Sequence, residues 1–420
     1  MIKHVLKRLT GAGLFLAILF AAIFGVRSFL DKTEVDEKYR QFFAEPNNID
    51  VIFMGTSHTY DALLPQEMWA NRSIPSYNFG QSNCTLPVSY YVLQMLDAYT
   101  DPTLVVVDLF SLFEYAGIGN GKYRTDARDQ QRVQFDAFPL SSVKIEAVND
   151  IFDDYENRID FLFNLAIYHN RWSEIKKDNF QPRNIPQKGA AFALGLCAMP
   201  DYRPGTAEAI SPLPPIGEDY LNRMISYCEA HGIRLLFTYL PFAAVQENFN
   251  AAASLDAYFA EHTWDHVAYL NMLDCPAIQY STDIYSDASH LNYIGAAAVT
   301  EWLGAYIADH YPDTVHRDDD AYRSWDDDYR EYVDYKISRF RDGALYDNLQ
   351  LIYGNDFTGE LLIRTDCADR FAADITLQNL LLRLGDRVHR QITEEPEAPP
   401  LLLRVTDRRD GTVVFEMQLP

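Results

Sequence analysis

The chain has 420 residues, of which 48% are hydrophobic and 14% aromatic, so it suits one large domain and a smaller one and is not a disordered chain. Its 60 acidic and 36 basic residues give a formal net charge of −24, which repels phosphate backbones and excludes nucleic acid as a partner. The five cysteines are scattered, with no CxxC or Cys/His spacing. We therefore expect no metal and no cofactor, and we favour free thiols over disulfides.

Residues 1–30 predict a membrane anchor. Three basic residues precede an apolar run at 14–26, which extends with its neighbouring residues to about 16–20 residues, near the lower limit for a helix that spans a bilayer. Basic residues before the run and acidic residues after it favour a single pass with the amino end inside and the main domain outside. A cleaved signal peptide is the alternative, because Ala21 and Ala22 supply small residues. A charged tether is expected at 31–47.

Strands and helices alternate from residue 48 to about residue 310, which predicts a three-layer α/β/α sandwich of about five parallel strands. The first strand, 51–54, ends at Gly55, which can adopt the backbone angles of a sharp turn. The turn raises Ser57 at the carboxyl edge of the sheet, where open α/β sheets bind ligands. The other predicted strands are 76–79, 103–109, 234–241 and 267–271, and the helices are about 63–69, 86–96, 220–230, 255–261 and 295–307.

Residues 111–215 interrupt this alternation and predict a largely helical insertion, because polar and aromatic residues interleave with apolar helical stretches and no strand pattern occurs. His169 and Arg171 lie among aromatic residues of this insertion. They are candidates for contact with a glycan substrate, and a structural pair within a helix is the alternative.

The last hundred residues have a different pattern. Residues 311–345 predict an acidic linker helix whose aspartates face solvent, without the pattern of an EF-hand calcium site. Residues 346–420 predict a small β-rich accessory domain, with strands at 358–364 and 401–405 and a hairpin turn at Asp410 and Gly411.

Three short motifs together suggest a family. They are Gly55-Thr56-Ser57, then Tyr77-Asn78-Phe79-Gly80-Gln81-Ser82-Asn83, and finally Asp287-Ala288-Ser289-His290 followed by Leu-Asn-x-x-Gly-Ala. The first motif alone is equally typical of a turn with a capping serine. In this order the three resemble the SGNH (GDSL-like) hydrolase superfamily, over about residues 49–307. The last motif most resembles the membrane-anchored cell-surface branch, which includes alginate O-acetyltransferases and the D-alanyl transfer protein of teichoic acid modification.

The same residues predict nucleophilic catalysis. A serine hydroxyl needs a base to take its proton, and an imidazole held by a carboxylate suits that role. Asp287 and His290 are three apart, so one compact turn can join them, and Ser57 follows a strand at the same edge. Asp283 is the alternative orienting acid. His58, next to the serine, either lines the substrate pocket or is structural.

The resemblance also implies the oxyanion hole. Its donors would be the backbone N–H groups of Ser57 and Gly80 and the side chain of an asparagine. Where the family commonly has Gly-x-Asn-Asp, this chain has residues 107–111, Val-Asp-Leu-Phe-Ser, so Asn83 is the candidate for the third donor by proximity. Thr56 replaces the aspartate of Gly-Asp-Ser, a change that the cell-surface branch tolerates.

The resemblance implies a serine esterase or O-acyltransferase outside the bacterial cell membrane. It would act on acetyl or D-alanyl esters of a cell-surface glycan or teichoic-type polymer, through an acyl-Ser57 intermediate and with a membrane-bound O-acyltransferase as partner. The alternative is a catalytically weak SGNH-like glycan-binding or assembly protein. The missing Asn-Asp block favours that alternative, and the Ser57, Asp287 and His290 set opposes it. A secreted lipase is disfavoured by the anchor and the polar insertion.

Overall fold

The structure is a computed structural model. It describes residues 2–30, 38–39, 41–43, 45, 49–114, 132, 135–152, 155–163, 165–175, 186–197, 199, 202–278 and 284–419. The chain forms two compact units, one of residues 1–44 with 121–185 and the other of residues 45–120 with 186–420. The tether predicted at 31–47 and the alternative acid Asp283 fall largely or wholly outside the described residues, and the predicted domain boundaries stay predictions.

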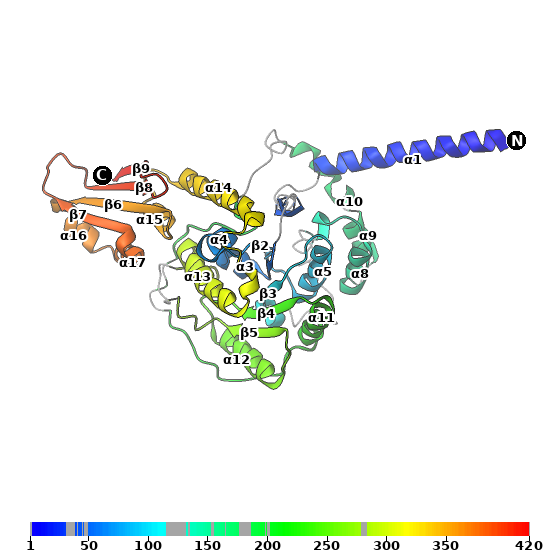
Figure 1. Cartoon of the computed structure of the whole chain (residues 1–420), viewed down its shortest axis with the longest axis horizontal. Coiled ribbons are helices and arrows are strands. Elements are labelled where there is room, and N and C mark those ends of the chain that lie inside the picture. The colour runs from blue at the N-terminus through cyan, green and yellow to red at the C-terminus, as the bar shows by residue number, and fades with distance from the viewer. Residues whose placement is uncertain are drawn as a thin grey trace. The chain divides into compact units, whose positions relative to one another are not determined.

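A five-stranded parallel sheet lies at the centre of the second unit (Figure 1). Its strands are β1 (Val51–Met54), β2 (Ser76–Asn78), β3 (Leu104–Asp108), β4 (Arg234–Tyr239) and β5 (Val267–Asn271). Their order in the sheet is β2-β1-β3-β4-β5, and every pair is parallel. Strands β1 and β3 are apolar runs that are buried along their whole length, as strands of a covered parallel sheet should be, and β2 is also buried although it carries Ser76 and Asn78. The predicted sheet is confirmed.

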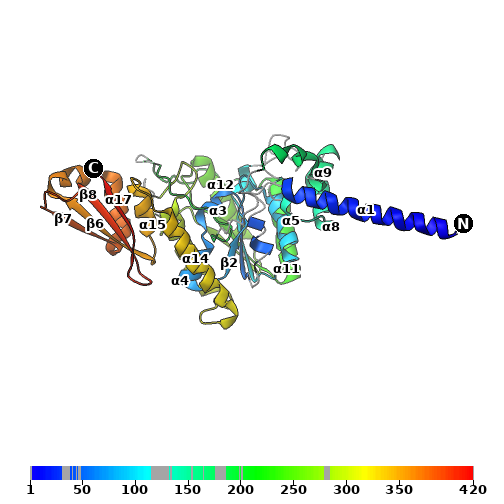
Figure 2. The same cartoon turned by 90° about the horizontal axis from the view of Figure 1, so that it is seen from above.

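Helices cover both faces of this sheet (Figure 1, Figure 2). They are α3 (Ser57–Ala62), α4 (Pro65–Arg72), α5 (Leu86–Asp97), α11 (Pro215–His231), α12 (Gln246–Glu261) and α13 (Tyr293–His310). The chain moves from β1 to β2 in one direction and from β2 through to β5 in the other, so right-handed crossovers put α4 on one face and the crossover helices α5, α11 and α12 on the other. The contacts agree, because α13 packs against α3 and α4 while α11 packs against α5.

The reversal of direction creates a topological switch point beside β1. Strands β1 and β3 are neighbours, with Val51 opposite Leu104 and Met54 opposite Val107, but the chain leaves them toward different sides of the sheet. Ligands of open α/β sheets bind at such a switch point, beyond the carboxyl ends of the strands. Ser57 follows β1 directly and therefore lies at this edge.

Two helices begin earlier than the sequence predicts. Helix α12 starts at Gln246 rather than near residue 255, and α11 starts at Pro215 rather than near residue 220. The additional first turns carry polar residues that dilute the apolar periodicity. Pro65 occupies the first turn of α4, as expected from its missing N–H group. All five cysteines are free thiols, three of them buried.

The C-terminal region holds a second, mixed sheet with the order β7-β6-β8-β9. Its elements, with the helices around them, are α14 (Arg323–Arg339), α15 (Leu345–Ile352), β6 (Phe357–Arg364), α16 (Ala368–Ala372), α17 (Ile375–Leu384), β7 (Val388–Thr393), β8 (Leu401–Asp407) and β9 (Val413–Leu419). Strands β8 and β9 form the expected hairpin, with Gly411 at a φ of 78°. Strand β7 and helices α15 to α17 were not predicted. Buried residues of this sheet join one hydrophobic cluster with Tyr293 and Ile294 of α13.

The first unit is helical where the structure describes it. Its helices are α1 (Ile2–Leu30), α8 (Ser142–Ile151), α9 (Tyr155–Leu162), α10 (Leu165–Tyr168) and the 3₁₀ turn η2 (His169–Ser173). The described residues of the 111–215 insertion contain no strand, as expected, and the rings of Phe135, Phe152 and Phe161 pack together. Within the described residues, none of the helices combines the length and the apolar character needed to cross a bilayer.

Candidate active site

A tight turn after β1 presents Ser57. Gly55 has a φ of +144°, and a Cβ atom at this position would lie 2.9 Å from the Cβ of Asp108, so only glycine suits the turn. Thr56 then caps α3, because its side-chain oxygen accepts a hydrogen bond from the backbone N–H of His58 at 3.3 Å. Ser57 is the first residue of this helix and is partly exposed. The local sequence thus fixes the position of the serine at the sheet edge.

The structure brings Ser57, His290 and Asp287 together. The Nε2 atom of His290 lies 2.8 Å from Ser57 Oγ, although the two residues are 233 positions apart in the chain. The other ring nitrogen, Nδ1, lies 2.9 Å from both carboxylate oxygens of Asp287. These distances are those of hydrogen bonds, and they join a carboxylate, an imidazole and a hydroxyl in one hydrogen-bonded series.

The loop before α13 holds Asp287 and His290 in position. The backbone N–H of Ser286 donates to the carbonyl of His290 at 2.9 Å, which closes the loop. Asp287 Oδ1 accepts from the backbone N–H groups of Ser289 at 2.7 Å and His290 at 2.9 Å, a local pattern that aspartate favours in turns. Burial would raise the pKa of Asp287, but these donors and the His290 ring lower it below its ordinary value, so the carboxylate is ionised at neutral pH.

A second carboxylate, Asp61, lies near the imidazole and was not singled out in the sequence. Its Oδ2 atom is 3.9 Å from His290 Nε2, and its side chain is only 11% exposed. Asp61 is four residues after Ser57 on α3, and residues at this spacing share a helix face. This spacing was the signal in the sequence that could have placed Asp61 near the serine. Tyr60 is also close: its hydroxyl is 3.0 Å from Ser82 Oγ, and its pKa is raised, chiefly by burial.

His58 is buried beside the catalytic candidates. Its ring centroid lies 4.1 Å from that of Phe110, 4.5 Å from that of Phe242 and 5.7 Å from that of His290. Burial, followed by repulsion from His290, lowers its pKa to about 3, so the ring is neutral at physiological pH. With only 5% of its surface exposed, His58 is better described as a structural residue than as a pocket-lining one.

The predicted oxyanion donors are less favourably placed. The backbone N–H of Gly80 donates to Asn78 Oδ1 at 2.9 Å, and the amide nitrogen of Asn78 donates to the carbonyls of Thr59 at 2.9 Å and Leu63 at 2.8 Å. Asn78 therefore ties the second strand to the helix that carries Ser57. Asn83 is exposed and has a φ of 52° in the following turn. The donor roles of Gly80 and Asn83 stay predictions.

We expect Gly80→Ala to lower the stability of the protein by about 1–3 kcal/mol and to reduce any activity of Ser57. A Cβ atom at Gly80 would lie 2.8 Å from the backbone nitrogen of Tyr60 and 2.9 Å from the Thr56 carbonyl, so the turn that carries Ser57 would have to move. Thermal unfolding and ester hydrolysis measure the two effects. The control is Gly13→Ala, where nothing lies within 4 Å of the added carbon. Equal behaviour of the two variants would contradict this account.

Comparisons with known proteins find only weak similarity. No family model matches the chain, and no curated protein matches it. One similar solved structure is a Desulfitobacterium hafniense protein named after the G-D-S-L lipolytic family, at 12% identity and a TM-score of 0.31, covering 61% of this chain and 99% of that one. Another is a Bacteroides fragilis protein named as an acylhydrolase, at 13% identity and a TM-score of 0.30, covering 64% and 94%. Likeness at these TM-scores carries no argument about function.

Asp108 occupies the end of β3, where the family pattern has its Asn-Asp block. It is 2% exposed, and its Oδ1 atom accepts a hydrogen bond from the backbone N–H of Leu240 at 3.0 Å. Burial raises the pKa of this carboxyl to about 7, against the opposing effect of hydrogen bonds from the Leu240 and Phe110 backbone. Asp108 therefore links β3 to the end of β4 rather than facing a substrate.

We expect wild-type stability to fall by roughly 2 kcal/mol between pH 5 and pH 8 through Asp108 alone. The folded-state pKa of about 7 is raised above the unfolded value, so the native protein holds a proton that the unfolded chain has released, and stability falls as the pH rises through this window. Asp108→Asn removes this contribution. Urea unfolding at pH 5 and pH 8 should show a flatter profile for Asp108→Asn than for wild type and for the exposed-site variant Asp101→Asn. Three parallel profiles would contradict the assignment.

His169 and Arg171 belong to the first unit, and the site around Ser57 belongs to the second. Arg171 has local partners: Nη1 donates to the Leu30 carbonyl at 2.8 Å and Nε to Glu174 at 3.1 Å. His169 is exposed in η2. The contacts of Arg171 are those expected if it has a structural role. Contact of either residue with a substrate stays a prediction.

Proposed function

We propose that this protein is a serine-dependent esterase or O-acyltransferase, with Ser57 as nucleophile, His290 as general base and Asp287 as the group that orients the imidazole. The observation that carries the proposal is the continuous chain from Asp287 through His290 to Ser57, with contacts of 2.9 Å and 2.8 Å. This arrangement allows a weak nucleophile to be deprotonated as it attacks.

In the proposed mechanism, Ser57 Oγ attacks the carbonyl carbon of an ester while its proton passes to His290 Nε2. Asp287 stabilises the imidazolium, and Asp61, 3.9 Å from Nε2, adds a second negative charge nearby. The tetrahedral intermediate then releases the alcohol, which takes the proton from His290, and the acyl group stays on Ser57. Water or a sugar hydroxyl, deprotonated by His290, attacks this ester and restores the serine.

The wider role is also a proposal. We place the enzyme outside the cytoplasm, acting on acetyl or D-alanyl esters of an exported or cell-surface polysaccharide, with a membrane-bound O-acyltransferase supplying acyl groups. Its support is the motif resemblance and the basic-then-apolar N-terminal pattern. Leu14, Phe15 and Phe20 of α1 are each at least 60% exposed, which favours an apolar surrounding for this helix. Cell fractionation with protease protection tests this location.

A catalytically weak binding protein remains the second candidate. The observation in its favour is that Gly80 N–H already donates to Asn78, while the chain has no Asn-Asp block after β3. Loss of one oxyanion donor typically reduces turnover by about 10²- to 10³-fold. A slow acyltransferase would still react covalently at Ser57, whereas a protein that only binds would not. Covalent labelling of Ser57 therefore distinguishes the two candidates.

A serine-directed fluorophosphonate provides that separation. We expect the full-length protein to be labelled at Ser57, and the label to form far more slowly in His290→Gln, because the base that activates the hydroxyl is gone. The control is His262→Gln, since this histidine is exposed and its Nδ1 atom lies 2.8 Å from the carbonyl of Tyr258. Absence of label in wild type, or equal labelling of wild type and His290→Gln, would favour the binding protein.

A further inference from the structure

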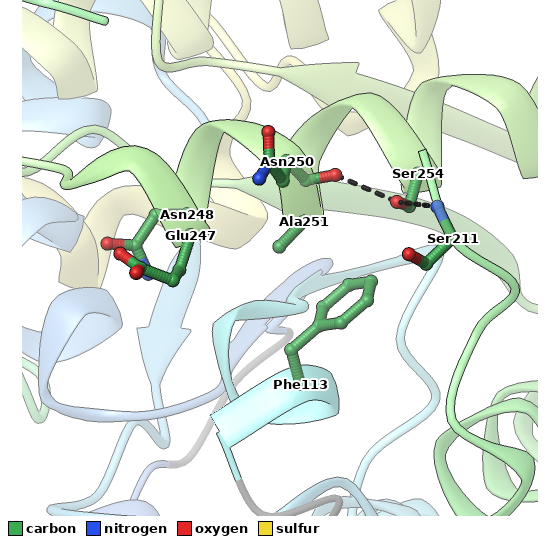
Figure 3. Close-up of a pocket in the computed structure, with 7 residues that line it drawn as sticks. All are labelled: Phe113, Ser211, Glu247, Asn248, Asn250, Ala251 and Ser254. Carbon is green, nitrogen blue, oxygen red and sulfur yellow. Dashed lines mark hydrogen bonds between the residues drawn. The ribbon is translucent and has the colours of Figure 1, made fainter. Parts of the chain in front are cut away.

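A pocket of about 390 Å³ opens between the short helix α6 (Phe110–Glu114), the irregular segment before α11, and α12 (Figure 3). Its volume lies in the range of small-molecule sites, roughly 300–1,000 Å³. The lining residues are Phe113, Ser211, Glu247, Asn248, Asn250, Ala251 and Ser254. We propose that this pocket is the acceptor subsite and that it takes a sugar unit without carboxylate or phosphate, an inference that rests on the proposed acyl transfer.

The lining combines an aromatic ring with hydrogen-bonding groups of both kinds. Phe113 offers an apolar face for the C–H side of a sugar ring. The Oδ1 atoms of Asn248 and Asn250 accept from backbone N–H groups, the first from Val245 at 3.0 Å and the second from Glu208 at 2.8 Å. Within the part of the chain that the structure describes, their amide nitrogens make no hydrogen bond, which leaves them as donors for a ligand. A sugar hydroxyl both donates and accepts, so it suits such a mixture.

The hydrogen bonds from backbone N–H groups hold the side chains of Asn248 and Asn250 in place. Ser254 Oγ donates to the Asn250 carbonyl at 2.8 Å and accepts from the backbone N–H of Ser211 at 3.0 Å, as the dashed lines of Figure 3 show. Two walls of the pocket, α12 and the segment that carries Ser211, are thus bonded to each other. A site with fixed polar groups needs little reorganisation when a ligand binds.

The charge of the lining residues determines which sugars the pocket can bind. Glu247 is the sole charged residue among the seven described residues that line the pocket, and its side chain is exposed. Among the described residues that line this pocket there is neither lysine nor arginine, and the chain as a whole carries a charge of −24. A uronate or a polyol phosphate would meet repulsion here, whereas a neutral hexose or a hexosamine would not. We therefore infer that the polysaccharide substrate contains neutral hexose or hexosamine units.

Two aromatic residues connect the elements that form the pocket with the turn that carries Ser57. The ring of Phe110 lies 4.1 Å from His58, and Phe113 follows three residues later on α6, about 4.5 Å along the helix. On the other side, the ring of Phe242 lies 4.5 Å from His58, and α12 begins four residues after Phe242. Helix α6 follows β3 and α12 follows β4, so both helices that line the pocket begin at the carboxyl edge of the sheet, the edge at which Ser57 lies.

Calorimetric titration of the full-length Ser57→Ala protein tests the site without turnover. The probes are a neutral hexose oligomer, a hexosamine oligomer and a uronate oligomer of equal length. We expect the first two to bind better than the third, and Phe113→Ala to weaken their binding roughly tenfold. Glu247→Lys should reverse the preference toward uronate. The control is Val245→Ala, at an exposed position just before α12 that does not line the pocket.

Preferential binding of the uronate oligomer to the unmodified pocket, or equal binding by the Phe113→Ala and Val245→Ala proteins, would overturn the inference. Its failure is distinguishable from failure of the proposed function. Selective sugar binding in a protein whose Ser57 resists fluorophosphonate would uphold the sugar site and overturn acyl transfer. Labelling of Ser57 without sugar binding would do the opposite.

Discussion

Replacing Ser57 by alanine is expected to lower hydrolysis of p-nitrophenyl acetate by about 10³- to 10⁶-fold, to the level left by the rest of the pocket. The same loss is expected for His290→Ala, because the hydroxyl 2.8 Å from Nε2 then has no base. The two residues act in one step. The double variant should therefore be no slower than either single variant, rather than showing the product of the two losses.

The control for this series is Ser338→Ala. Ser338 is an exposed serine of α14 whose hydroxyl donates to the Tyr335 carbonyl, so its loss should leave turnover unchanged. Initial rates of wild type and the four variants at one pH provide the measurement. If Ser57→Ala and wild type hydrolysed the ester equally, the observed rate would come from elsewhere on the protein, and the binding-protein alternative would be preferred.

Replacing Lys336 by methionine is expected to lower the free energy of unfolding by about 3–5 kcal/mol. Lys336, on α14, is fully buried, and its Nζ atom lies 2.7 Å from Asp356, 2.7 Å from the Tyr293 hydroxyl and 3.2 Å from Glu67. Burial alone would lower the pKa of Lys336, but the two carboxylates raise it well above its ordinary value, so the side chain is charged. Methionine leaves these carboxylates buried without their cation.

The matched control is Arg330→Met on the same helix. Arg330 pairs with Asp327, but their side chains are 63% and 68% exposed, and surface pairs contribute about 0–1 kcal/mol. Urea unfolding of both variants gives the comparison. Adding Asp356→Asn to Lys336→Met should recover part of the lost stability, because it removes one unpaired buried charge. A Lys336→Met protein as stable as the Arg330→Met protein would contradict the assignment of a buried ion cluster.

Much of the α/β part was predictable because its causes are local. Strand β3 is a β-branched run bounded by polar residues, and Gly55 marks a turn that other residues cannot form without strain. The joining of Asp287 and His290 follows from a spacing of three within one loop. Bringing Ser57 beside them needs only that parallel strands end at the same edge. Their catalytic roles stay predictions.

Other features depend on contacts that a sequence does not display. Lys336 and Glu67 are 269 residues apart, and the pattern around Lys336 predicted only an acidic linker helix. The same holds for Asn78, whose amide joins β2 to α3, and for β7, which pairs parallel to β6 only after a helical crossover. The acidic run around α14 was expected to face solvent; Asp327 does, but Asp328 pairs with Lys188.

The most direct test of the central claim is to capture the acyl group on the serine. The full-length protein is mixed with an acetyl ester, quenched in acid during turnover, digested and examined by mass spectrometry. The account predicts one acetyl group on the peptide that contains Ser57, absent from Ser57→Ala and from unreacted protein. Steady ester hydrolysis that depends on His290, with no acetyl group found on Ser57 at any quench time, would contradict it.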